Sequence, residues 1–182
     1  MHGIALALGS ALLGWMALLP VTAAGQATGG GPTDPQIAAT VVAANQADID
    51  AAKAVKSRTK NKEVRDFAET MVRDHEGANK EAKALVKKLH VKPEPNPTSK
   101  SLQDGAKKNI AALKKLKGAE LDRAYIDHEV AYHEQVLDAI KTTLTPNAQN
   151  AELKALLEKD TPAFQAHLDH AKELQAKFGA AK

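Results

Sequence analysis

Side chains of metal-binding types interrupt the apolar patterns of four segments in this sequence. Between Val64 and Leu89, positions spaced alternately by four and three residues are apolar except for one histidine, His75. This spacing is typical of the buried face of an amphipathic helix. Three further segments show the same pattern, each interrupted by aspartate, histidine or both. The interrupting residues are Asp48, His75, His133, Asp160 and His167.

In a protein core, these side chains indicate a metal centre. An unpaired carboxylate is costly to bury, so an interruption in every segment suggests that the interrupting residues meet. Imidazole and carboxylate groups that converge from facing helices are how helical bundles bind metals. An ion would also neutralise the buried carboxylates. We therefore expect a divalent metal cofactor, zinc or another transition metal.

A hydrogen-bond network without any metal is the alternative interpretation. His75 bonded to Asp48, and His133 bonded to Asp160, would satisfy the buried polar groups and specify how the helices align. The sequence leaves both interpretations open, and it also leaves open which histidines would be ligands.

The position of each candidate along its helix gives a first test of convergence. With a rise of ~1.5 Å per residue, Asp48 lies ~17 Å and His75 ~23 Å from the turn that joins their helices. His133 lies ~20 Å and His167 ~31 Å from the second turn, so Asp160 matches the height of His133 better. This estimate predicts a cluster of Asp48, His75, His133 and Asp160 rather than a cluster of three histidines.

Other ligand pairs are weaker candidates. His167 and His170 share a helix face, as do Glu129 and His133. No glutamate is followed by a histidine three residues later, which is the pair that supplies ligands to di-iron centres. This absence argues against a ferritin-type enzyme that oxidises metal ions, which stays an alternative function, and an enzyme is the less favoured class of function.

Helical periodicity predicts an all-α chain. Helices are expected at residues 34–57, 61–90, 119–144 and 151–178, with a short lysine-rich helix at 102–117. Three prolines in residues 91–101 predict an extended crossover. Pro162 predicts a kink or a restart, with Asp160 or Thr161 as the cap. The result is two antiparallel hairpins joined by a Pro-rich crossover, an antiparallel four-helix bundle.

The N-terminal segment is typical of an export signal. Residues 4–19 form an almost unbroken apolar run that small residues follow, although no Lys or Arg precedes it. We expect a signal peptide at residues 1–24, a flexible spacer at 25–33 and a bundle domain at 34–180. The expected location is periplasmic or otherwise extracytoplasmic, with no transmembrane span after cleavage.

Composition argues against several classes of function. A net charge of +3 and 3% aromatic residues argue against nucleic-acid binding. The sequence has no cysteine, which excludes disulfides, and its serines lie in or beside flexible stretches, so a hydrolytic triad is not expected.

A purely structural envelope or stress protein is a further alternative, in which residues 102–117 contact an unknown envelope protein. The sequence does not indicate the oligomeric state.

Three stretches occur in an order that identifies a family. They are "VRDFAETMVRDHEGANKEAKAL", "LDRAYIDHEVAYHEQVL" and "TPAFQAHLDHAKEL". Over residues 34–174 the chain resembles the exported bacterial family called domain of unknown function 4142. The resemblance implies a ferritin-like fold and an extracytoplasmic location, and it brings no established activity. Asp48 stands where this family usually has glutamate. The residues that match the family motifs are Asp74, His75, Asp122, Tyr125, His133, Pro162 and His167.

Overall fold

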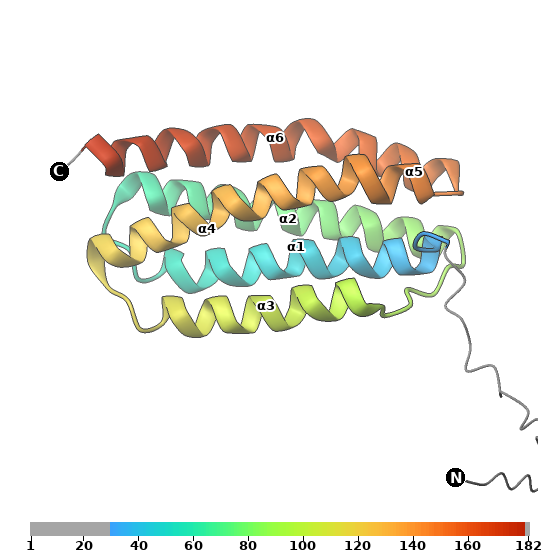
Figure 1. Ribbon diagram of the computed structural model, residues 1–182, viewed down its shortest axis with the longest axis horizontal. Coiled ribbons are helices and arrows are strands. Elements are labelled where there is room, and N and C mark those ends of the chain that lie inside the picture. The colour runs from blue at the N-terminus through green and yellow to red at the C-terminus, as the bar shows by residue number, and fades with distance from the viewer. Residues whose placement is uncertain (1–29, 181–182) are drawn as a thin grey trace, which may run out of the picture. The chain divides into compact units, whose positions relative to one another are not determined.

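The computed structural model describes residues 30–180, and the expected signal peptide at residues 1–24 lies outside them. In this described part the protein is all-helical and has no strand, which confirms the predicted class. The longer helices lie roughly along one common direction (Figure 1). The elements are α1 (Asp34–Lys56), α2 (Lys62–Lys88), α3 (Pro97–Leu113), α4 (Gly118–Ala139), the π-helical turn η1 (Ile140–Leu144), α5 (Thr145–Asn147) and α6 (Ala151–Ala180).

Polar side chains fix where α1 and α2 begin. Gln36 Oε1 accepts a hydrogen bond of 3.1 Å from the backbone N–H of Thr33. Pro35 lies in the first turn of α1, where a missing N–H costs no helical hydrogen bond. At the start of α2, Asn61 Oδ1 accepts from the backbone N–H of Glu63 at 2.9 Å. A short link between the two helices then lets them pack against each other.

α3 begins earlier than the sequence predicts, at Pro97 rather than at residue 102. The cause is a capping box. The Asn96 side chain accepts from the backbone N–H of Ser99 at 2.9 Å, and Ser99 Oγ accepts from the backbone N–H of Asn96 at 3.0 Å. Pro97 then fits the first helical position, so a proline expected to exclude helix instead starts one.

Two polar anchors hold α3 against α1. Near its start, Asn96 Nδ2 donates to the carbonyl oxygen of Gln36 at 2.8 Å and to Thr40 Oγ1 at 3.1 Å. At its end, the guanidinium of Arg58, just past α1, donates to the carbonyl oxygen of Leu113 at 2.9 Å. The helix ends there rather than at residue 117, and it lies along α1 (Figure 1).

The helix predicted at residues 119–144 changes its geometry partway along. α4 ends at Ala139, and the π-helical turn η1 follows it. A π-helical turn contains an additional residue compared with an α-helical turn. The residues after it therefore lie at a different height and angle from those that an uninterrupted α-helix would give.

α6 continues through Pro162. The predicted restart is wrong, because Asp160 and Thr161 lie inside this helix rather than at a cap. The Thr161 hydroxyl donates to the carbonyl oxygen of Leu157 at 2.8 Å. Pro162 has no N–H, so the carbonyl group of Glu158 loses its usual helical donor.

Two hydrophobic clusters form the core, and the polar interruptions other than Asp160 lie between them along the chain. On α2, His75 falls between Met71 of the first cluster and Ala78, which packs against the second. The first cluster includes Val55, Phe67, Met71, Tyr125 and Leu174, and the second includes Ile37, Ile140, Leu157 and Phe164. Within residues 30–180, no helix combines the length and the hydrophobicity that crossing a membrane requires.

Replacing Pro162 by alanine should stabilise the protein. Pro162 is exposed, so alanine removes no buried contact, and it supplies an N–H for the Glu158 carbonyl. Because an interior proline costs about 3 kcal/mol relative to alanine, we expect the free energy of unfolding in urea to rise by about 1–3 kcal/mol. Circular dichroism provides the measurement, and the exposed substitution Lys154→Ala is the control. A variant less stable than the wild type would contradict this account of α6.

Candidate metal centre

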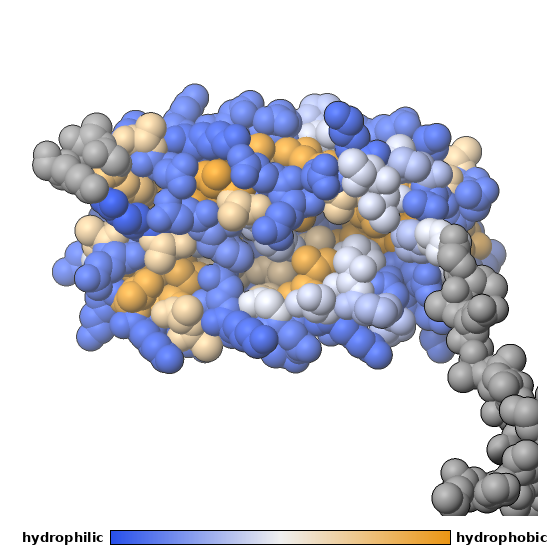
Figure 2. Space-filling model, viewed as in Figure 1, coloured by the Kyte–Doolittle hydropathy of each residue, from blue (hydrophilic) through white to orange (hydrophobic). Residues whose placement is uncertain are grey.

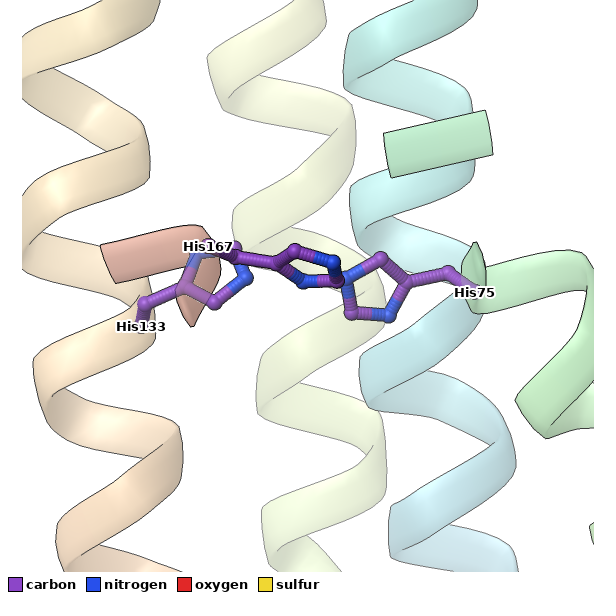
Figure 3. A group of neighbouring side chains, drawn as sticks. All are labelled: His75, His133 and His167. Atoms are coloured by element: carbon purple, nitrogen blue, oxygen red, sulfur yellow. The ribbon is translucent and has the colours of Figure 1, made fainter. Parts of the chain in front are cut away.

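Three histidines from three different helices meet in the core. His75 comes from α2, His133 from α4 and His167 from α6, and their side chains point toward one another (Figure 3). The ring centroids lie 5.6 Å apart for His75 and His133, 5.3 Å for His75 and His167, and 5.5 Å for His133 and His167. The exposed fractions of the three residues are 3%, 1% and 5%, so the rings are shielded from water.

Each ring is hydrogen-bonded through one nitrogen to an oxygen that can only accept. The partners are an amide oxygen, a main-chain carbonyl oxygen and a carboxylate oxygen. Because none of these groups has a proton to give, the bonded ring nitrogen must carry the N–H. The pairs are His75 Nδ1 with Asn45 Oδ1 at 2.8 Å, His133 Nδ1 with the Glu129 carbonyl oxygen at 3.0 Å, and His167 Nε2 with Asp74 Oδ2 at 3.0 Å.

The opposite ring nitrogens are buried and make no hydrogen bond within the described residues. They are His75 Nε2, His133 Nε2 and His167 Nδ1. In a neutral imidazole whose other nitrogen carries the proton, this second nitrogen presents a lone pair. Metal-ligating histidines in proteins have the same arrangement, with the outer N–H held by a carboxylate or a carbonyl group.

Two buried carboxylates lie beside the histidines. Asp48 Oδ2 is 3.2 Å from His75 Nε2 and 3.6 Å from His133 Nε2. Glu129 Oε2 is 3.5 Å from His133 Nδ1. These are ion-pair distances without hydrogen-bond geometry, and no oxygen of either carboxylate has a hydrogen-bond partner in residues 30–180.

The potential ligands form two overlapping groups. His75, His133 and His167 make one, and Asp48, Glu129 and His133 make the other. In each group, one ligand atom per residue lies within 4.8 Å of the others. His133 belongs to both groups and is therefore the centre of the site.

Burial controls the protonation of these groups. It raises the pKa of Asp48 to about 8, and burial together with the charge of Asp48 raises the pKa of Glu129 well above its usual value. Burial also lowers the pKa of His133 to about 4, and it lowers the pKa of His75 well below the usual value, with further lowering by His133 and His167. The imidazoles are therefore neutral near pH 7, and their lone pairs are available to a metal.

The structure corrects the predicted height of His167. The estimate from helical rise favours Asp160 over this histidine, but His167 joins the cluster, and Asp160 lies half-buried in the wall of a neighbouring cavity. The estimate starts from a turn centred at residue 146, whereas α6 begins only at Ala151. Counted from there, His167 lies ~24 Å along its helix, close to the ~21 Å of His133 counted from Asn147.

Two polar residues at the site are not among the main candidate ligands predicted from the sequence. Glu129 is only a weak candidate by sequence, yet it is fully buried beside His133. Tyr125 lies one turn earlier on α4, and its buried hydroxyl also has no hydrogen-bond partner in the described residues. Tyr125, Glu129 and His133 follow each other at four-residue intervals on one helix face. This polar stripe is the signal that could have placed Glu129 in the site.

In the absence of metal, Asp48 should make stability depend on pH. Burial raises its pKa in the folded state to about 8, above the ordinary aspartate value of 3.8, so the folded state keeps a proton that the unfolded state releases. The wild type should therefore lose stability relative to Asp48→Asn as pH rises from about 4 to about 8, by up to about 1.4 kcal/mol per pH unit.

Urea unfolding with a chelator present, at pH 5 and at pH 8, measures this difference. The exposed substitution Asp138→Asn is the matched control for the loss of one carboxyl group. A pH-independent difference between wild type and Asp48→Asn would show that Asp48 does not hold the extra proton.

Comparisons with known proteins agree with this all-helical fold. Among solved structures, the chain is similar to the crystal structure of a DUF305 fragment from Deinococcus radiodurans, with a TM-score of 0.67 and 13% sequence identity. The match covers 81% of this chain and 99% of that chain, and at this identity it concerns the fold alone.

Sequence comparison gives the family. No curated protein matches the chain. A family model described as a domain of unknown function, DUF4142, matches residues 19–174, which is most of the sequence. The chain therefore belongs to the DUF4142 family.

Proposed function

We propose that this protein binds a divalent transition metal, zinc in the first place, through His75, His133 and His167. The observation that carries this proposal is the arrangement of the three rings. Each ring has one N–H held by an acceptor and the opposite nitrogen buried without a hydrogen-bond partner in the described residues. A network that existed only to satisfy polar groups would not leave three lone pairs together in the core.

The spacing of the rings fits a single ion. Three imidazoles on one tetrahedral zinc, with Zn–N distances of about 2.1 Å, place their ring centroids ~5 Å apart. The observed separations are 5.6, 5.3 and 5.5 Å. Three neutral nitrogens and a carboxylate also form a ligand set that zinc accepts.

Asp48 is the proposed fourth ligand. Its Oδ2 lies within 3.6 Å of the Nε2 atoms of both His75 and His133. A bound cation would take the place of the proton that burial now holds on this carboxyl group, and it would compensate the cost of burying the charge. Glu129 Oε2 lies 3.5 Å from Nδ1 of His133, so a second carboxyl group lies beside the proposed ligands.

The proposed setting is an exported protein. We infer a ferritin-like, antiparallel four-helix bundle made by α1, α2, α4 and α6, with α3 as an additional helix on α1. The N-terminal signal segment supports a periplasmic or otherwise extracytoplasmic location. A metal site buried in a cysteine-free core suits such a compartment, because it needs no reduced thiol.

Thermal unfolding of residues 25–182 tests the metal proposal. A metal that binds only the folded state adds about 2.7 kcal/mol at a concentration one hundred times its Kd. For a domain of this size we therefore expect Tm to rise by about 5–10 °C on addition of Zn(II) to the chelator-stripped protein. The double variant His75→Leu/His133→Leu should lose this rise.

His90→Asn provides the matched control, because His90 is exposed and has a positive φ of 53° that asparagine tolerates. It should keep the full response to zinc. Cu(II), Mn(II) and Fe(II) form parallel series that identify the preferred ion. If no metal raises Tm, the histidines are a hydrogen-bonded network and the proposal fails.

Asp74 should act as a positioning residue for His167. It lies at the surface edge of the site, where hydrogen bonds from Arg73 and His167 lower its pKa although partial burial raises it. Asp74→Asn should weaken zinc binding by about 10–100-fold, because the ring of His167 loses its charged acceptor. Competition with a chromophoric chelator measures the affinity.

The control is Glu76→Gln, which changes a nearby exposed carboxylate on α2 that pairs with Lys53 instead. Equal zinc affinities for Asp74→Asn and wild type would mean that His167 needs no oriented partner, or that it is not a ligand.

A further inference from the structure

A cavity of about 210 Å³ lies beside the histidine cluster. Side chains of α1, α2, α3, α4, η1 and α6 line it, and the rings of His75 and His133 are part of the lining. Most of its wall is apolar. The principal apolar residues are Val41, Leu102, Val136, Ile140, Leu157 and Phe164.

The placement of α3 explains why this space is open. Asn96 and Arg58 hold the two ends of α3 against α1 and its following link, so the helix is not drawn onto α4. On the face shown in Figure 2, hydrophobic residues are visible in a hollow between the hydrophilic side chains of α3 and α4. The exposed residue Thr98 of α3 is part of the cavity lining and marks its mouth.

The charges around the cavity limit what it can hold. None of the described residues that line it is a lysine or an arginine, so it offers an anion no permanent positive charge. The carboxyl group of Asp160 is the lining group that could carry a negative charge, and burial raises its pKa. Tyr132 donates to the carbonyl oxygen of Ala44 at 2.8 Å and Asn45 accepts from His75, whereas the Nε2 atoms of His75 and His133 have no hydrogen-bond partner in the described residues.

We propose that this cavity binds a small neutral molecule with an apolar, preferably aromatic body. Its volume exceeds the about 150 Å³ of an engineered apolar cavity that binds benzene in another protein. The stacked rings of His75 and Phe164, 5.0 Å apart and inclined by 12°, form a flat part of the wall against which an aromatic ring can pack. This site needs no metal, although it shares the rings of His75 and His133 with the metal site proposed above.

Three probes of similar size but different charge test the proposal: toluene, benzoate and benzylamine. Binding to the chelator-treated protein is followed by ligand-observed nuclear magnetic resonance. We expect toluene to saturate one site and to bind more tightly than either charged probe. Tighter binding of benzoate or benzylamine would overturn the assignment of a neutral ligand, and no saturable binding of toluene would overturn the site itself.

Two variants locate the site. Ala139→Leu adds bulk to the α4 wall, and Thr98→Phe closes the mouth from the exposed side of α3. Both should weaken toluene binding by about tenfold or more, which corresponds to ~1.4 kcal/mol. Ala124→Leu makes the same change on α4 outside the cavity and should bind like wild type.

Circular dichroism checks that each variant is folded, and because Thr98 is exposed, its substitution removes no buried contact. Undiminished toluene binding in both folded variants would show that the molecule binds elsewhere. Because metal is removed throughout, a negative result here leaves the zinc proposal untouched, and the thermal experiment with zinc leaves this one untouched.

Discussion

The burial of a polar layer between two hydrophobic clusters is the constraint on which the rest of the structure depends. Removing a charged or polar group from water is unfavourable unless another group compensates it. Here Asp48 and Glu129 have raised pKa values, and the three central imidazoles have lowered ones, so both kinds of group are driven toward their neutral forms. The same conditions leave imidazole lone pairs directed at one another. Burying this layer is unfavourable for the free energy of folding, but its groups are of the types that bind a metal ion.

The helices around this layer have separate tasks. α2, α4 and α6 each contribute one ring, and α1 contributes the carboxylate and one of the acceptors that fix the rings. α3 contributes no ligand. Its anchors at Asn96 and Arg58 hold it on α1, and it forms one wall of the cavity that reaches His75 and His133. Among the described residues, the candidate site and the cavity beside it are thus formed mainly by five helices, and all of these except α3 carry candidate ligands or their hydrogen-bond acceptors.

Periodicity predicts the long helices and the burial of His75 and His133, because an apolar stripe places its exceptions in the core as well. It cannot fix relative heights. The position of His167 depends on where α6 begins and on the π-helical turn before it, and neither follows from a repeat of 3.6 residues. Two helices also include a proline at which the sequence predicts no helix or a helix restart. Asn96 caps a helix that begins at Pro97, and α6 passes through Pro162 without restarting.

The acceptor of His133 differs in kind from those of the other two histidines. His75 and His167 depend on the side chains of Asn45 and Asp74, whereas His133 donates to the main-chain carbonyl oxygen of Glu129. A substitution at position 129 changes the side chain and leaves that oxygen in the helix. Side-chain substitutions at position 129 therefore leave the acceptor of His133 in place. His75 and His167, in contrast, keep their acceptors only if the residues at positions 45 and 74 are also kept. Among relatives, a loss of the site is expected to begin at those two positions.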